Sequence, residues 1–238
     1  MNPPALSFKE LPADRILVVA PHPDDESLGC GGLLWHFQRL NREVHFAFVT
    51  DGGASHPNSP TWPRHRLADE REKEAEKALF RLGHAHSVRH FMRLRDADMP
   101  MEGSDQYATA LATAADIVLH ARPDLVILPW RRDPHRDHRD AWKLFTEAVA
   151  QTGLKPSTME YAIWLDELGT PQDRPEQSEM ERINFHIGEA EAAKRQAVEA
   201  HLTQTGHVIT DDEQAFCLKP HTIDRLVGPI ESYWRPLP

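Results

Sequence analysis

Short apolar runs alternate in the first half of the chain with longer segments whose apolar residues recur every three or four positions. Four runs have the length and composition of buried strands, the third being the weakest: residues 16–20, 44–50, 87–91 and 125–129. The segments between them have the periodicity of helices: residues 28–40, 64–82 and 104–122. Strands that alternate with helices indicate βαβ units. We therefore expect an α/β, Rossmann-like fold with a mostly parallel sheet and helices on both faces.

The second half of the chain is less regular. Two segments have helical periodicity and two have the composition of strands: residues 140–151 and 189–203, then residues 161–165 and 183–187. Residues 166–180 are polar and contain two prolines, which predicts an exposed loop. We find no internal repeat and no convincing domain boundary. A single domain is therefore expected, with a core over about residues 15–205 and a C-terminal extension over residues 206–238.

Charge and cysteine content narrow the classes of function. The chain has 27 Lys and Arg against 37 Asp and Glu, and this net charge of −10 is a poor match for nucleic acid or an anionic membrane. Its two cysteines, Cys30 and Cys217, form no CxxC pair, which excludes a disulfide framework and a cysteine-based zinc finger. Neither a secretory signal nor a membrane span of ~18 apolar residues is present in the sequence. We expect a cytoplasmic protein without nucleic-acid or membrane partners, and leave open whether it forms a homo-oligomer.

The first candidate site, with the sequence PHPDDE, covers residues 21–26 and begins where the first strand ends. Three adjacent carboxylates beside His22 repel one another unless a cation offsets them, which favours a metal ion. Acidic residues are also common in the first turn of a helix, so helix capping by Asp25 or Glu26 is the alternative for this segment alone.

The second candidate site, with the sequence DPHRDH, covers residues 133–138 and follows the fourth strand. His135 and His138 are three positions apart and share a face of a helical turn, although a polar loop with solvated histidines is an alternative. In a doubly wound sheet the first and fourth strands lie side by side, and ligands bind beyond their carboxyl ends. The two motifs are therefore expected to meet. Two histidines and one aspartate are typical of a catalytic zinc site and of a non-haem Fe(II) triad, and spacing does not decide between them.

Together the two motifs resemble those of the LmbE-like or PIG-L family, whose members are zinc-dependent N-acetylglucosaminyl deacetylases with a Rossmann-like fold. Weaker matches are TDG at residues 50–52, RxxExxxAxxxLG at residues 71–83 and KxxAxxxHxxQ at residues 194–204, so the resemblance covers roughly residues 15–205. Arg136 stands in the second motif where the family usually has proline.

The resemblance implies a role for five residues of the two motifs. It implies that His22, Asp25 and His138 bind zinc. It implies that Asp24 is the general base, and that His135 serves as the acid and polarises the oxyanion.

Four further residues are expected to contact the substrate. The resemblance implies that Arg71 and Asp96 hold the sugar. Trp130 and Arg132 directly precede the second motif, where a tryptophan can stack on a sugar ring and an arginine can bind an anionic group. The alternative is that Trp130 belongs to the core and that Arg131 and Arg132 pair with nearby carboxylates.

We therefore predict a zinc-dependent hydrolase that removes the acetyl group from an N-acetylglucosamine-type or related sugar-containing small molecule. Ferrous iron can occupy the same ligand set. Three alternatives stay open: an amidase for larger amides of the thiol-conjugate type, a non-haem Fe(II) oxygenase, and an inactive binding module.

Overall fold

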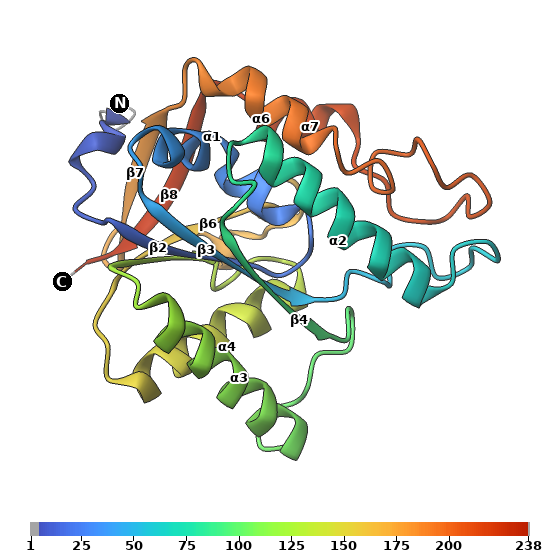
Figure 1. Cartoon of the computed structure of the whole chain (residues 1–238), viewed down its shortest axis with the longest axis horizontal. Coiled ribbons are helices and arrows are strands. Elements are labelled where there is room, and N and C mark those ends of the chain that lie inside the picture. Colours follow the sequence, from blue (N-terminus) through green and yellow to red (C-terminus); the bar gives the residue numbers. More distant parts are fainter. Residues whose placement is uncertain (1–4, 238) are drawn as a thin grey trace.

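A computed structural model of the protein describes residues 5–237. At its centre is an eight-stranded sheet in the order β1-β7-β8-β6-β5-β2-β3-β4 (Figure 1). The strands are β1 (Ala5–Leu6), β2 (Arg15–Ala20), β3 (Glu43–Thr50), β4 (Val88–Leu94), β5 (Leu125–Pro129), β6 (Ser157–Tyr161), β7 (Met180–His186) and β8 (Ile230–Pro236). The helices are α1 (Asp25–Arg39), α2 (Arg64–Arg81), α3 (Asp105–Ala121), α4 (Arg136–Thr152), α5 (Leu165–Leu168), α6 (Ala190–Val198) and α7 (Pro220–Leu226), with short 3-10 turns at Phe8–Glu10 and Pro171–Asp173.

The sheet is mostly parallel, as predicted. Strand β2 pairs in parallel with β3 on one side and with β5 on the other. Strands β3 and β4 are added on one side of β2, and β5 and β6 on the other, so the order of the strands reverses at β2 and β5. The antiparallel pairs are those that β8 makes with β6 and β7. The carboxyl ends of β2 and β5 are therefore adjacent at the topological switch point, where an open α/β sheet binds its ligands.

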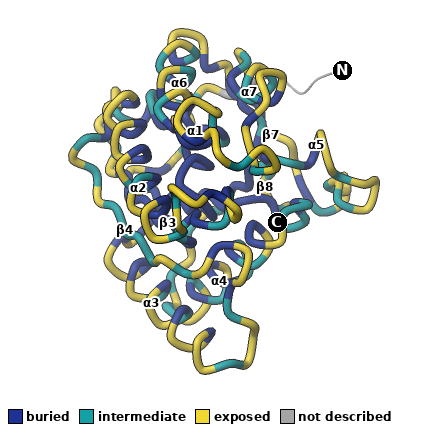
Figure 2. The backbone as a smooth tube through the Cα atoms, turned by 90° about the vertical axis from the view of Figure 1, so that its right-hand side faces the viewer, coloured by how far each residue is buried: buried dark blue, intermediate teal, exposed yellow. Residues whose placement is uncertain are grey.

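Helices cover both faces of the sheet, as Figure 1 shows. Alternate side chains of β2 point to opposite faces because a strand has a two-residue period. Ile16 and Val18 pack in the cluster formed with α1 and α2, whereas Leu17 and Val19 pack in the cluster formed with α3 and α4. Figure 2 shows that the buried stretches lie in the middle of the molecule and the exposed ones on its outside. Burial on both faces explains why these strands are continuous apolar runs in the sequence.

The first four predicted strands are confirmed, with small shifts at their ends. The predicted strand over residues 161–165 is wrong, because β6 ends at Tyr161 and the next apolar residues lead into helix α5. The predicted helix over residues 189–203 ends early, at Val198. The backbone N–H of Thr203 instead donates to the Glu74 carboxylate at 2.9 Å, which fixes this segment as a turn.

The C-terminal residues contribute to the sheet. Residues 206–238, expected to form an extension after the core, supply strand β8, which lies between β6 and β7. No helix within residues 5–237 has the length and apolar composition that crossing a membrane requires.

Candidate active site

A pocket of about 500 Å³ opens beside the carboxyl ends of β2 and β5. Both sequence motifs reach it. From the first motif His22, Asp24 and Asp25 line the pocket, and from the second motif Pro134 and His135 do so. The topology of the sheet thus brings together two segments that lie more than 100 positions apart in the sequence. This is the location that the order of the strands predicts.

The first motif forms a tight turn into helix α1 with an unusual backbone at Asp24. Asp24 has φ 153° and ψ −26°, a conformation that non-glycine residues rarely adopt and that neighbouring groups must stabilise. Its N–H donates to the Glu26 carboxylate at 3.0 Å. Arg71 donates to the carbonyl oxygens of Pro23 and Gly52 at 2.9 and 2.8 Å, and its guanidinium lies 3.1 Å from an Asp24 oxygen. Arg71 therefore holds both the backbone of the turn and the carboxylate that the turn presents.

The three side chains that the resemblance implies as metal ligands converge at the start of α1. Asp25 Oδ2 lies 3.1 Å from His22 Nδ1 and 3.3 Å from His138 Nε2. Tetrahedral zinc, with bonds of about 2.0–2.2 Å, separates its ligand atoms by about 3.4 Å, so these donors fit such an ion. Among residues 5–237, neither ring nitrogen of the fully buried His138 has a hydrogen-bond partner. Buried polar atoms are nearly always paired, and a cation at this point would satisfy one of these nitrogens.

His22 also faces two other carboxylates. Its Nε2 lies 3.3 Å from Asp96 Oδ1 and 3.3 Å from Asp137 Oδ2. Two three-residue groups around His22 have their potential ligand atoms within 4.8 Å of one another: His22, His135 and His138, and His22, Asp96 and Asp137. Asp137 lies inside the second motif, but no role was predicted for it from the sequence. Its position between His135 and His138 is the one feature of the sequence that points to it.

The carboxylates of the first motif titrate differently. Burial raises the pKa of Asp24 to about 6, with Arg71 opposing the shift. Burial acts in the same direction on Asp25, but the charges of His138 and His22 and the hydrogen bond with His22 outweigh it and hold the pKa of Asp25 well below its usual range. Asp24 is thus the more basic of the two neighbours, which suits it to accept a proton.

His135 has a defined hydrogen-bonding state. Burial and the charges of His22 and His138 lower the pKa of His135 to about 4, so its ring is neutral at pH 7. His135 is the N-cap of α4, and its Nδ1 accepts the N–H of Asp137 at 3.2 Å. The ring proton therefore resides on Nε2, which can donate a hydrogen bond.

Of the four residues expected to contact the substrate, the structure brings two to the pocket. Arg71 and Asp96 line it. Trp130 is fully buried, packs against Leu165, and donates from Nε1 to the carbonyl of Asp173 at 2.7 Å. Trp130 is therefore a core residue outside the pocket.

The arginines beside Trp130 also lie outside the pocket. Arg132 forms an ion pair with Glu179, and Arg131 forms one with Glu160. The structure therefore agrees with the alternative interpretation, in which Trp130 belongs to the core and both arginines pair with nearby carboxylates. Arg136, which replaces the family's usual proline, pairs with Asp140 at 3.0 Å on the exposed side of α4.

The pocket wall includes residues that the sequence did not reveal. Trp164 and Phe216 form an edge-to-face pair with ring centroids 5.7 Å apart, and both line the pocket. Gln204 donates to Ser55 Oγ at 3.2 Å, while its own Oε1 is buried without a partner in the described part of the chain. These residues come from irregular segments, whose only sequence signal was the match of Gln204 to the KxxAxxxHxxQ pattern.

Comparison with known proteins agrees with this geometry. The family model described as PIG-L, GlcNAc-PI de-N-acetylase, matches residues 17–149. The diacetylchitobiose deacetylase of Thermococcus kodakarensis is 28% identical over 146 residues, which are 59% of this chain and 51% of the relative, so the match spans about half of that protein. A probable N-acetyl-alpha-D-glucosaminyl L-malate deacetylase 2 of Bacillus anthracis is 26% identical over 83% of this chain and 84% of its own length.

Solved structures agree on the fold. The N,N'-diacetylchitobiose deacetylase of Pyrococcus horikoshii superimposes with a TM-score of 0.69 at 23% identity, over 97% of this chain and 85% of the other. The family model covers more than half of the residues and contains both motifs that form the pocket. The chain therefore belongs to the PIG-L family, described as GlcNAc-PI de-N-acetylase.

Proposed function

We propose that this protein is a zinc-dependent deacetylase that hydrolyses the acetamide group of an N-acetylglucosamine-type sugar. The observation that carries the proposal is the position of Asp25, whose Oδ2 lies 3.1 Å from His22 Nδ1 and 3.3 Å from His138 Nε2. Asp24 lies beside this donor set in the same pocket. The two curated relatives support the substrate class, because the names of both describe deacetylases of N-acetylated sugars.

His22, Asp25 and His138 are the proposed metal ligands. Zinc held there supplies Lewis acidity toward water and toward an amide carbonyl oxygen, and ferrous iron can supply the same. Asp133 Oδ1 lies 3.6 Å from His138 Nδ1, on the side of the ring away from Asp25, so this buried carboxylate attracts the ring electrostatically without a hydrogen bond. Asp25 Oδ2 also accepts the N–H of His22 at 2.9 Å, which fixes the carboxylate in place.

Asp24 is the proposed general base. A water molecule attacks the acetamide carbon, and an Asp24 oxygen accepts the proton that the water loses. The pKa of about 6 makes this carboxylate basic enough to accept a proton and still ionised at pH 7. When the C–N bond breaks, acetate leaves with the water oxygen and the sugar amine takes the proton from Asp24.

His135 is the proposed hydrogen-bond donor to the amide oxygen. Its Nε2–H faces charge that develops on that oxygen as water attacks, and a donor in a buried site stabilises such charge strongly. The lowered pKa of His135 favours this role over that of a proton-transferring acid, because the ring is neutral at pH 7 before the reaction begins.

The pocket wall fits a sugar. Trp164 and Phe216 offer an apolar surface of the kind on which the C–H face of a pyranose packs. Asp96 is an acceptor for a sugar hydroxyl, and Gln204 lines the same pocket. Arg71 is already bound to the turn and to Asp24, so we assign it to positioning the base.

The first experiment measures metal content and acetate release together. Wild type, Asp25→Ala and Asp24→Asn are purified anaerobically without added metal, and plasma mass spectrometry gives the metal per chain. Release of acetate and free amine is then followed with N-acetylglucosamine, N,N'-diacetylchitobiose and phosphorylated N-acetyl sugars. The surface variant Asp224→Asn serves as the control for loss of a carboxylate.

We expect Asp24→Asn to hold as much metal as wild type, and Asp25→Ala to hold about one ion per chain fewer. Asp24→Asn should lose about 10²–10⁴-fold in turnover, the usual contribution of general base catalysis. Near-wild-type turnover of Asp24→Asn would refute the assignment of the base. A metal-loaded enzyme that releases acetate from none of these sugars but cleaves larger amides would indicate an amidase, and oxygen consumption with iron would indicate an oxygenase.

A further inference from the structure

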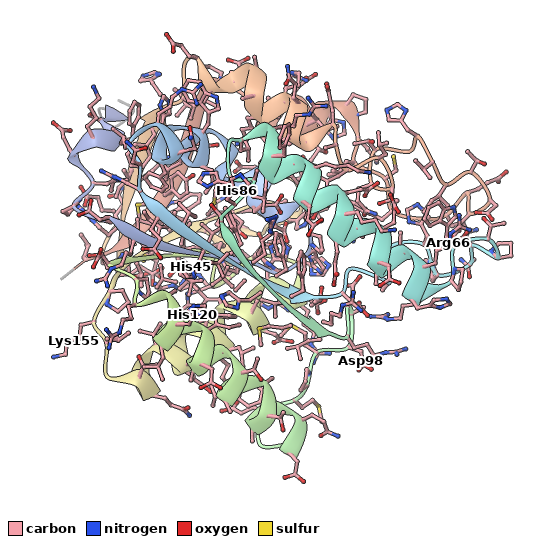
Figure 3. All side chains as sticks on the ribbon, viewed as in Figure 1. His45, Arg66, His86, Asp98, His120 and Lys155 are labelled. Atoms are coloured by element: carbon pink, nitrogen blue, oxygen red, sulfur yellow. The ribbon has the colours of Figure 1, made fainter. Side chains whose placement is uncertain are left out.

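A second group of histidines lies toward the amino ends of the strands, away from the pocket at their carboxyl ends. His45 is near the amino end of β3, His90 is in β4, and His120 is in the last turn of α3. Figure 3 labels His45 and His120 on neighbouring elements. The residues that line the pocket lie at the carboxyl ends of the strands, so these three histidines are separate from the proposed zinc ligands.

The sheet register places two of these histidines on one face. His45 is opposite Val88 and His90 is opposite Ala47, so His45 and His90 are diagonal neighbours that point the same way. Ala47 belongs to the apolar cluster under α3 and α4. Helix α3 covers this face, and its C-terminal turn brings His120 over the strands.

The three rings are close enough to share an ion. Their centroids are 6.0 Å apart for His45 and His90, and 5.4 Å apart for each of the two pairs with His120. One nitrogen of each ring lies within 4.8 Å of the corresponding nitrogens of the other two. Ligand nitrogens around tetrahedral zinc are about 3.4 Å apart, so binding requires a modest approach of the rings. His120 is exposed, and exposed side chains change rotamer readily.

The hydrogen bonds leave ligating nitrogens free. Glu43 Oε1 lies 2.9 Å from His45 Nε2, so this nitrogen carries the proton and Nδ1 keeps its lone pair. His45 Nδ1 and His90 Nε2 are both buried, and neither has a hydrogen-bond partner within residues 5–237. Unpaired buried nitrogens on two adjacent histidines are unusual, and a bound cation would account for both.

His90 is kept in the form that binds metals. Burial lowers the pKa of His90, and the charges of His45 and His120 lower it further. A neutral imidazole offers a lone pair, whereas three protonated rings at this separation would repel one another.

We propose that His45, His90 and His120 form a second, non-catalytic site for a late first-row divalent cation, with zinc as the expected ion. Imidazole ligands suit zinc, copper and nickel, and three of them leave a position for water on the exposed side of His120. Glu43 accepts a hydrogen bond from the ring of His45 and fixes its orientation. A cation here ties the edge strand β4 and helix α3 to β3, and so stabilises one end of the sheet.

The test compares zinc binding in wild type, His120→Ala and His86→Ala. His120 and His86 are both exposed, so neither change is expected to disturb the core, and His86 lies outside the cluster. Each full-length protein is stripped with a chelator and dialysed against a series of zinc concentrations, and metal per chain is measured by plasma mass spectrometry. Thermal unfolding is followed at the same zinc concentrations.

We expect His120→Ala to hold one equivalent less than wild type, or to bind that equivalent at least tenfold more weakly, and His86→Ala to match wild type. The melting temperature of wild type should rise more with zinc than that of His120→Ala. The difference between variants is independent of the proposed catalytic metal: wild type and His120→Ala hold two and one ions if that proposal is right, and one and none if it is wrong. Equal stoichiometry and affinity in all three proteins would overturn the inference.

Discussion

A buried ion pair joins strand β8 to helix α6 and gives the sharpest prediction about stability. Lys194 Nζ donates to Glu231 Oε1 at 2.7 Å, and the two side chains are 1% and 2% exposed. The other donors to the Glu231 carboxylate are the backbone N–H groups of Gly32 and Leu33 and the hydroxyl of Tyr233. Four hydrogen bonds on one carboxylate, all buried, mean that its charge is fully compensated.

Replacing Glu231 by Gln keeps the shape of the side chain and removes its charge. The Lys194 ammonium is then buried without a counter-ion, and breaking one side of a buried pair typically costs about 3–5 kcal/mol. A whole domain is stable by only about 5–15 kcal/mol. We expect Glu231→Gln to lower the free energy of unfolding by about 3 kcal/mol, the lower end of the range, because Lys194 can lose its proton. Urea unfolding followed by far-ultraviolet circular dichroism measures this change.

A matched control is available on the neighbouring residue. Arg195 pairs with Asp224 at 3.0 Å, but these side chains are 40% and 67% exposed, and exposed pairs contribute about 0–1 kcal/mol. Asp224→Asn should therefore change stability little. The double variant Lys194→Met, Glu231→Gln should recover part of the loss, because it removes the uncompensated charge. A cost for Glu231→Gln no larger than that of Asp224→Asn would refute this reasoning.

Three further predictions test the turn, the packing of α1 and a buried histidine. Arg71→Lys cannot span Pro23, Gly52 and Asp24, so turnover should fall at least tenfold with metal content unchanged; a rise in KM alone would instead make Arg71 a sugar contact. Gly32→Ala places a Cβ 2.6 Å from Ile187 Cβ and should cost about 1–3 kcal/mol in urea unfolding, whereas Gly228→Ala, with 3.6 Å to its nearest neighbour, should not. Burial lowers the pKa of His84, so the unfolded chain binds more protons than the folded one, and stability falls as pH drops below about 6.5. Between pH 7 and pH 5, the free energy of unfolding of His84→Gln should therefore decrease less than that of wild type.

The parallel half of the sheet could be predicted because its strands are buried on both faces. Strand β5 carries the run LVILP and lies where its apolar residues indicate. Strand β8 could not be recognised from its pattern, because the inward-facing Glu231 is a charge whose partner Lys194 lies 37 positions away. Strand β6 was misplaced for the opposite reason, since the apolar Ile163 and Leu165 fill the core from a turn and a short helix. In both cases a tertiary contact outweighs the local pattern.

The site divides in the same way. Positions at the ends of β2 and β5 follow from the sheet topology, so His22 and His135 could be placed in one crevice from the order of strands. The pocket wall could not be predicted in this way, because Phe216 belongs to an irregular segment. A tertiary contact holds it there: the Phe216 N–H donates to the Ser55 carbonyl at 3.0 Å. Trp130 shows that a position next to a motif in the sequence does not place a side chain in the pocket. Its Nε1 donates to the Asp173 carbonyl inside the protein, so the indole is hydrogen-bonded without facing the pocket.

The strained turn at Asp24 links stability to the proposed chemistry. A non-glycine residue with φ 153° costs of order 1–3 kcal/mol, and a helix could begin after β2 without that cost. The turn directs the Asp24 carboxylate to Arg71, while Asp25, one residue later, contacts His22 and His138. Arg71 and Glu26 stabilise the conformation that keeps the two aspartates apart: Asp25, the proposed metal ligand, has a lowered pKa, and Asp24, the proposed base, has a raised one.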